Sequence, residues 1–277
     1  MDPLRYEHGT TIHFKYFIRV GTPEIYGVRP AIMQLPARFN TLAPSVREAL
    51  TGDLVEVRGL SRRALVTDRS MLSNDVILIL DGWAFSYIAF ASGARQITAI
   101  HLPGDLLFPR AAGSGDSEYG TCAVSNLLIG TLPDALVGAG TALENIVQDA
   151  RVQNAAILEA WLANMGRRDA YARTAHLLCE MHTRAILAGL TANATFQMPL
   201  FQEDLGDILG LTPVHINRMM RRLREGQVAK VGFGRVDILN LENLMAIGSF
   251  DDHYLHPAGG QERGCCQTNG AAASRCV

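Results

Sequence analysis

The spacing of apolar residues changes near residue 133, and this change constrains the fold more than any other feature of the chain. From residue 54 to about 132, short β-type runs alternate with turn signals such as Asp81-Gly82. Between Pro133 and Met165, apolar residues recur three, four or seven positions apart, as on one face of a helix. The sequence thus predicts an α+β protein in which an antiparallel sandwich or barrel precedes a long helix. The expected strands are Leu54–Arg58, Ala64–Thr67, Val76–Leu80, Trp83–Phe90, Gln96–Leu102 and Thr121–Leu132.

The predicted long helix is longer than a compact domain usually needs. Its length favours a coiled-coil-like dimer seam, although a core helix that packs within one chain fits the same pattern. The residues of its apolar face that we assign to the seam are Leu143, Val147, Ala150, Ile157 and Trp161.

Composition narrows the function. The 277 residues are 48% hydrophobic and carry a formal charge of −2, which excludes wholly basic nucleic-acid binders but not a local basic patch. No apolar run approaches the roughly 18 residues of a membrane helix, and the start lacks a signal-peptide pattern, so we expect a cytoplasmic protein. Five cysteines without a CxxC pair predict neither a disulfide framework nor a metal site.

Two short helices joined by a tight turn are predicted between Pro199 and Glu225. Gly210 ends the first, and Thr212 followed by Pro213 begins the second with a capping hydroxyl and a proline at the first helical position. This arrangement is typical of a helix-turn-helix, whose second helix enters the DNA major groove. The apolar residues expected on the inner faces are Leu205, Ile208 and Leu209, then Ile216, Met220 and Leu223.

Basic residues gather on and after the second helix. Residues 212–235 contain six Lys/Arg against the single acid Glu225, a local charge of +5. A hairpin, the wing of a winged helix, is predicted from two strands, Val228–Val231 and Arg235–Leu239, joined by the turn Gly232-Phe233-Gly234. Arg218 can pair with guanine, and Asn217 and His215 can reach base edges or phosphates. The expected phosphate contacts are Arg221, Arg222, Lys230 and Arg235; the alternative is a solvated arginine-rich face.

These residues resemble a known family. Phe201–Arg224 is similar to the helix-turn-helix of the bacterial Crp/Fnr transcription regulators, and Thr212–Arg218 (TPVHINR) is close to a form frequent there. The segments Asp81-Gly82-Trp83-Ala84, Arg95-Gln96-Ile97 and Leu102-Pro103-Gly104-Asp105-Leu106 resemble its sensor β-roll. The resemblance covers roughly residues 38–245.

The resemblance implies a domain order and a mode of action. We expect an arm at 1–37, a cyclic-nucleotide-binding-like β-roll (double-stranded β-helix) at 38–132, a dimerisation helix at 133–166, a winged helix-turn-helix at 167–248 and a disordered tail at 249–277. It implies a homodimer that reads a near-palindromic DNA site and contacts RNA polymerase. It also implies that Arg218 contacts guanine; Val214 stands where many members carry a base-reading glutamate.

The expected effector pocket, Gly104, Asp105 and Leu106, departs from the cyclic-nucleotide pattern. That pattern pairs Gly-Glu-Leu with a later Arg-Ala-Ala, but Arg110-Ala111-Ala112 follows Gly104 after only six residues. We therefore expect no cyclic-AMP binding, although binding of another, unknown small-molecule effector remains an alternative. The four cysteines of an oxygen-sensing iron–sulfur cluster are absent too, so no cofactor is expected.

Two other classes of protein are alternatives to a DNA-binding regulator. A ligand-binding or interaction module could dock a protein through its helical end, and salt dependence would distinguish it from a DNA binder. A cupin-like enzyme needs several histidines, whereas His101 is the only one between Leu54 and Leu132. Without other catalytic motifs, we predict no enzyme and no catalytic residue.

Overall fold

The structure, a computed structural model, describes residues 35–40, 44–52, 56–67, 76–109, 117–132 and 142–256. Most of the predicted arm at 1–37 lies outside the described residues, as do Arg110-Ala111-Ala112 and residues 133–141. The short η1 (Ala37–Phe39) and α1 (Pro44–Gly52) precede the β-rich part.

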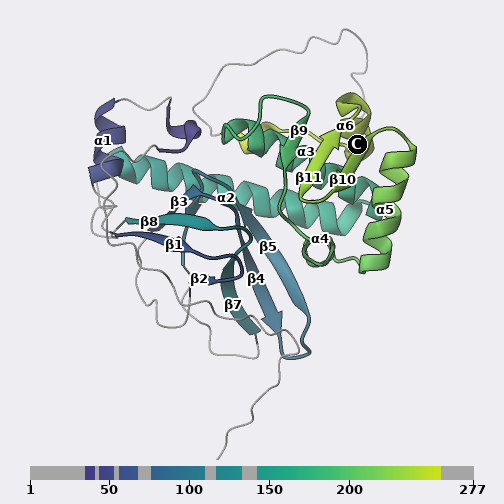
Figure 1. The fold of residues 1–277 in the computed structure, drawn as a ribbon, viewed down its shortest axis with the longest axis horizontal. Coiled ribbons are helices and arrows are strands. Elements are labelled where there is room, and N and C mark those ends of the chain that lie inside the picture. Colours follow the sequence, from purple (N-terminus) through teal and green to yellow (C-terminus); the bar gives the residue numbers. More distant parts are fainter. Residues whose placement is uncertain are drawn as a thin grey trace, which may run out of the picture.

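Two four-stranded antiparallel sheets form the predicted β-roll (Figure 1). One has the order β1-β8-β3-β6 and the other β2-β7-β4-β5. The run Thr121–Leu132, predicted as one strand, is two strands, because Ser125-Asn126 forms a turn whose Ser125 hydroxyl accepts a hydrogen bond from the backbone N–H of Trp83. The strands are β1 (Glu56–Leu60), β2 (Leu65–Thr67), β3 (Val76–Asp81), β4 (Ala84–Phe90), β5 (Arg95–His101), β6 (Leu106–Leu107), β7 (Ser117–Ala123) and β8 (Leu127–Leu132).

The long helix α2 (Ala142–Arg167) runs along the β-roll toward the C-terminal elements (Figure 1). Its predicted seam is wrong, because those residues pack within the chain. Leu143 and Val147 are buried with Leu50 and Leu78, and Ala150 packs against the same cluster. Ile157 and Trp161 are buried in the main core. The helical periodicity correctly predicted an apolar face on this helix. That face packs in the core of one chain, which is the alternative to a dimer seam that the sequence left open.

The C-terminal elements form the predicted winged helix-turn-helix. Strands β10, β11 and β9 make a three-stranded antiparallel sheet beside the helices. Ile216 and Leu223 of α5 are buried as predicted, and the partly buried Met220 packs against the same core; Met219, which was not predicted, is buried too. The elements are α3 (Ala170–Leu187), β9 (Thr195–Gln197), α4 (Gln202–Leu209), α5 (Pro213–Glu225), β10 (Ala229–Gly232), β11 (Arg235–Ile238) and α6 (Leu241–Gly248).

The chain beyond α6 corrects another prediction. Residues 249–256, predicted as disordered, are ordered and include the 3-10 helix η3 (His253–Leu255). Phe250 and Leu255 are buried, and the Tyr254 hydroxyl donates a hydrogen bond to Glu180 at 2.9 Å. The prediction of disorder came from the Gly, Ala and polar content of the whole tail, which gives no weight to the few residues that pack against the core. Residues 257–277 lie outside the described part of the chain.

Candidate nucleic-acid interface

The turn between α4 and α5 has the geometry that the sequence predicts. Gly210 adopts φ +62°, a left-handed conformation that glycine takes without steric penalty. Thr212 caps α5, and its hydroxyl accepts a hydrogen bond from the backbone N–H of His215. Pro213 follows in the first turn of α5. These local signals fix where α5 begins and therefore which of its residues face outward.

A groove of about 740 Å³ separates α5 from the wing formed by β10 and β11. Its walls carry five predicted DNA contacts: Asn217, Arg218, Arg221, Lys230 and Arg235. The other lining residues are Gln202, Val214, Met220, Arg224, Val231, Gly232, Phe233 and Asp237. The structure thus brings the recognition helix and the wing together on one basic, exposed surface.

Four predicted contacts lie outside the groove lining. Thr212 and Pro213 form the N-terminus of α5, and the His215 ring lies 3.0 Å from the Thr212 hydroxyl. The guanidinium of Arg222 stacks 3.9 Å from the ring centre of Tyr171 in α3, on another side of the helix. Sequence reasoning placed Arg222 with Arg221 because it counted charge without resolving the helical face.

Two groove residues that were not predicted, Arg224 and Phe233, could have been found from their positions in the sequence. Arg224 lies three residues after Arg221, so both project on the same side of α5. Phe233 lies in the turn of the wing between Gly232 and Gly234, next to the predicted cations of the two strands. Gln202 reaches the groove from α4 by tertiary packing, for which the sequence offers no signal.

The groove cations differ in how they are paired. Arg218 has no carboxylate partner among the residues that the structure describes. Arg221 lies 3.7 Å from Glu225, and an exposed ion pair of this kind contributes little to stability. Arg235 donates to Asp237 at 2.8 Å; hydrogen bonds from Thr195 and then Arg235 lower the pKa of Asp237. Arg218 and Arg224 are thus the groove arginines most available to a ligand, since Arg221 and Arg235 have acidic neighbours.

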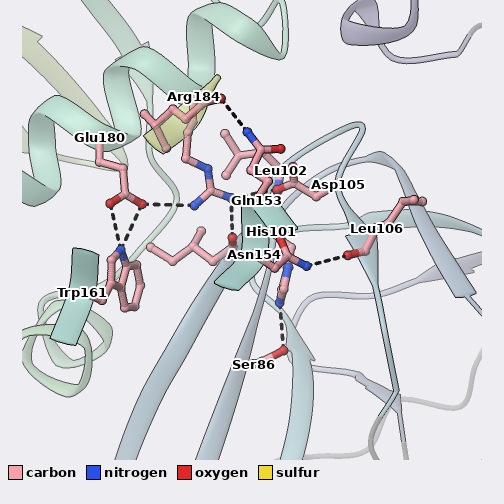
Figure 2. A network of polar contacts seen from close by, with 12 residues as sticks. Ser86, His101, Leu102, Asp105, Leu106, Gln153, Asn154, Trp161, Glu180 and Arg184 are labelled. Carbon is pink, nitrogen blue, oxygen red and sulfur yellow. Dashed lines mark hydrogen bonds and ion pairs between the residues drawn. The ribbon is translucent and has the colours of Figure 1, made fainter. Parts of the chain in front are cut away.

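The predicted effector residues occupy the turn from β5 to β6, and all three are engaged within the chain. The Asp105 carboxylate accepts from the backbone N–H of Leu102 and from Arg184 of α3, both at 2.8 Å (Figure 2). The Gly104 N–H donates to the carbonyl of Ile79, and the carbonyl of Leu106 accepts from Asn154 of α2. Their role as an effector pocket stays a prediction, and the observed role is to join the β-roll to the helices.

Arg184 and Glu180 extend this junction into the core. Arg184 donates to Glu180 at 3.3 Å and to the carbonyl of Ile100 at 2.6 Å. Trp161 also donates to both Glu180 oxygens, at 2.9 and 3.0 Å (Figure 2). Burial raises the pKa of the Glu180 carboxyl, and Arg184, Tyr254 and Trp161 oppose that rise.

A second junction connects the β-roll to the first helix of the helix-turn-helix. Arg95 of β5 contacts Asp204 at 3.1 Å and Asp207 at 2.6 Å. The Gln96 amide donates to the carbonyls of Asp207 and Ile208 in α4. The sensor-like part therefore holds the element against which α5 packs.

Other kinds of site find no support within the described ranges. Those residues include no group of three or more His, Cys, Asp or Glu side chains placed to hold a metal ion. None of their helices combines the length and the apolar character needed to cross a bilayer.

The fold and the basic groove define a class: a β-roll joined by a long helix to a winged helix-turn-helix that binds DNA. Residues 172–247 match the model of the Crp-like helix-turn-helix domain. The chain is 26% identical over 174 residues to the "Fumarate and nitrate reduction regulatory protein" of Vibrio cholerae, covering 61% of this chain and 69% of that protein. It is also 26% identical over 175 residues to the "Nitrogen fixation regulation protein FixK" of Bradyrhizobium diazoefficiens, covering 61% and 73%.

Solved structures share the fold. FixK2 from Bradyrhizobium japonicum superposes with a TM-score of 0.59 and 22% identity, covering 69% of this chain and 96% of that one. A CRP-family transcriptional regulator from Thermus thermophilus gives 0.57 and 16%, with the same coverage. Residues 172–247 are thus similar to a Crp-like helix-turn-helix domain, and together with the curated relatives this match indicates a Crp/Fnr-type transcription regulator with a helix-turn-helix DNA-binding domain.

Proposed function

We propose that this regulator acts in the cytoplasm as a homodimer that reads a near-palindromic DNA site. Each α5 would lie in the major groove of one half-site, and the phosphate backbone would run between α5 and the wing. The observation that carries the proposal is the groove, where Arg218 and Arg224 form no ion pair with a carboxylate among the described residues and Lys230 adds a further positive charge. Their positive charge is complementary to phosphate.

Each groove residue has a role that its chemistry supports. Arg218 offers two parallel donors to O6 and N7 of a guanine, and Asn217 can pair with an adenine edge. Val214, 77% exposed on the same side of α5, offers an apolar contact such as a thymine methyl group accepts. Arg221, Arg224, Lys230 and Arg235 contact phosphates and set the register.

The dimer seam is assigned to a different face of α2 from the one that the sequence suggested. Val152, Leu158 and Leu162 are 64%, 55% and 74% exposed, and Ala155 is exposed between them. They recur three or four residues apart, so they form one apolar stripe along the helix. A second copy of α2 would cover this stripe in a coiled-coil-like contact.

Gel-shift measurements on genomic fragments test the DNA proposal. The wild type forms discrete complexes, and Arg218→Ala loses them because guanine readout is worth about 1–3 kcal/mol. Arg222→Ala is the matched control: it removes the same charge from the same helix outside the groove lining. Equal binding by wild type and Arg218→Ala, with discrete sites kept, would contradict the assignment.

Sedimentation tests the dimer. Leu162→Glu places a charge in the apolar stripe, so we expect a monomer that binds half-sites only weakly. Leu190→Glu is the control, since Leu190 is 41% exposed in the loop before β9. A Leu162→Glu protein that remains dimeric would place the seam elsewhere.

We further propose that the β-roll does not respond to cyclic AMP and that the regulator contacts RNA polymerase on the DNA. The first proposal is supported by Asp105, whose carboxylate is occupied by Arg184 and by a backbone N–H. Thermal unfolding with and without cyclic AMP should give the same midpoint. A large upward shift would show binding and contradict this proposal.

A further inference from the structure

We propose that Phe233 is a DNA-contacting wedge that enters the minor groove beside each half-site and favours a flexible pyrimidine–purine step there. This inference rests on the proposed function, since it assumes that α5 occupies the adjacent major groove. It assigns to the wing an apolar role beyond phosphate contact.

The Phe233 side chain is fully exposed, at 110% of its reference area. Other exposed phenylalanines are far better covered: Phe201 is 46% exposed beneath the Arg62 guanidinium, and Phe90 is 41% exposed. No ring or cation contact involves Phe233 within the described residues. An exposed phenyl ring contributes no hydrophobic stabilisation to the free protein, and it gives such stabilisation only when another molecule covers it.

The backbone at Phe233 is unfavourable for this residue type as well. Phe233 has φ +53° and Gly234 has φ +73°, so both residues of the hairpin turn are left-handed. Such two-residue turns favour Asn-Gly or Gly-Gly, and a bulky residue in this region is strained. Phe233 thus contributes neither packing nor turn stability to the free protein.

The position of Phe233 follows from the groove. With α5 in the major groove, the phosphate backbone fills the space between α5 and the wing, whose lining includes Arg218 and Lys230. The tip of the wing then lies across the phosphate ridge, and the next surface of B-DNA there is the minor groove. Apolar side chains that enter this groove partly unstack a base step and bend the duplex. Steps such as TA and CA/TG unstack most easily, so the wedge would select for them.

The test uses the full chain and the variant Phe233→Asn. Asparagine tolerates the left-handed turn, so folding should be preserved while the ring is removed. We expect about a tenfold loss of affinity with an unchanged dependence on salt, because stacking involves no counterion release. Arg224→Ala is the contrasting variant, which should lower the salt dependence instead. Phe233→Trp should keep most of the affinity.

A fluorescent base supplies the direct readout. With 2-aminopurine at the step flanking a half-site, the wild type should raise the fluorescence by unstacking the base, and Phe233→Asn should not. Replacing that step by a stiff A-tract should weaken the wild type more than the variant. Equal affinity and equal fluorescence for both proteins would overturn the wedge. If the wild type itself shows no binding that depends on Arg218, the proposed function fails instead.

Discussion

Arginines on the outer face of α5 and arginines at the junctions with the β-roll occupy opposite environments. Arg218 and Arg224 are exposed in the basic groove. Arg184 is only 8% exposed and is paired with two carboxylates, and Arg95 bridges two acids of α4. Arginines paired and buried within the chain hold the domains together, whereas arginines that the chain leaves unpaired remain available for phosphate and base edges.

The largest effect should follow from removing the buried cation. Arg184→Met removes the cation that Asp105 and Glu180 share, and breaking a buried ion pair from one side costs about 3–5 kcal/mol. Urea unfolding monitored by Trp fluorescence measures the loss. Arg224→Met, on the exposed face, is the control.

The same experiment has a rescue. In Arg184→Met/Glu180→Gln the orphaned charge of Glu180 is also removed, so stability should recover in part. If Arg184→Met proves no less stable than Arg224→Met, the contrast between the two regions fails.

The next effect concerns pH. Burial, opposed by Asp105 and reinforced by Arg184, lowers the pKa of His101 to about 4. The unfolded chain takes up this proton near its ordinary pKa of about 6.5, so the free energy of unfolding falls as pH drops from 6.5 toward 4. The loss attributable to His101 is about 3 kcal/mol. Urea unfolding across this range should show a shallower decline for His101→Gln; parallel curves would contradict the assignment.

Arg95→Met should have an intermediate effect. Arg95 is partly exposed and contacts Asp204 and Asp207, so its loss should cost about 1–2 kcal/mol. Hydrogen exchange should rise in α4 more than in the centre of the β-roll, because α4 loses its anchor. Unchanged hydrogen exchange in α4 would show that the ion pairs of Arg95 do not stabilise this helix.

The smallest effect on stability is expected at the DNA face. Arg224→Met should change the free energy of unfolding by less than about 0.5 kcal/mol. It should nevertheless reduce the slope of log affinity against log salt by about 1. A variant that loses stability but keeps the slope would place Arg224 with the structural arginines.

The sequence predicted those features of the fold that local chemistry determines. Turn residues marked most strands, and Gly210, Thr212 and Pro213 located both helices of the helix-turn-helix. It did not distinguish the core face of α2 from the exposed face to which we assign the dimer seam, because both apolar faces have the same period. Leu143 and Trp161 point into the core, whereas Val152 and Leu162 point outward. Periodicity reveals a face but not what covers it.

The candidate site was predicted where spacing on one helix decides the geometry, as for Arg218 and Asn217. The junction was missed because its partners come from distant segments: Asp105 follows β5, and Arg184 lies in α3. In the sequence, Glu180 and Arg184 look like an ordinary surface pair four residues apart. Only tertiary packing buries that pair and adds Asp105 and Trp161 to it.

Hydroxyl-radical footprinting on a site selected from random DNA tests the central claim most directly. A dimer that presents two α5 helices should protect two patches centred about 10 base pairs apart, with pseudo-two-fold symmetry. Arg218→Ala should lose both patches at protein concentrations where Arg222→Ala keeps them. A single protected patch, or protection that survives the loss of Arg218, would contradict the account.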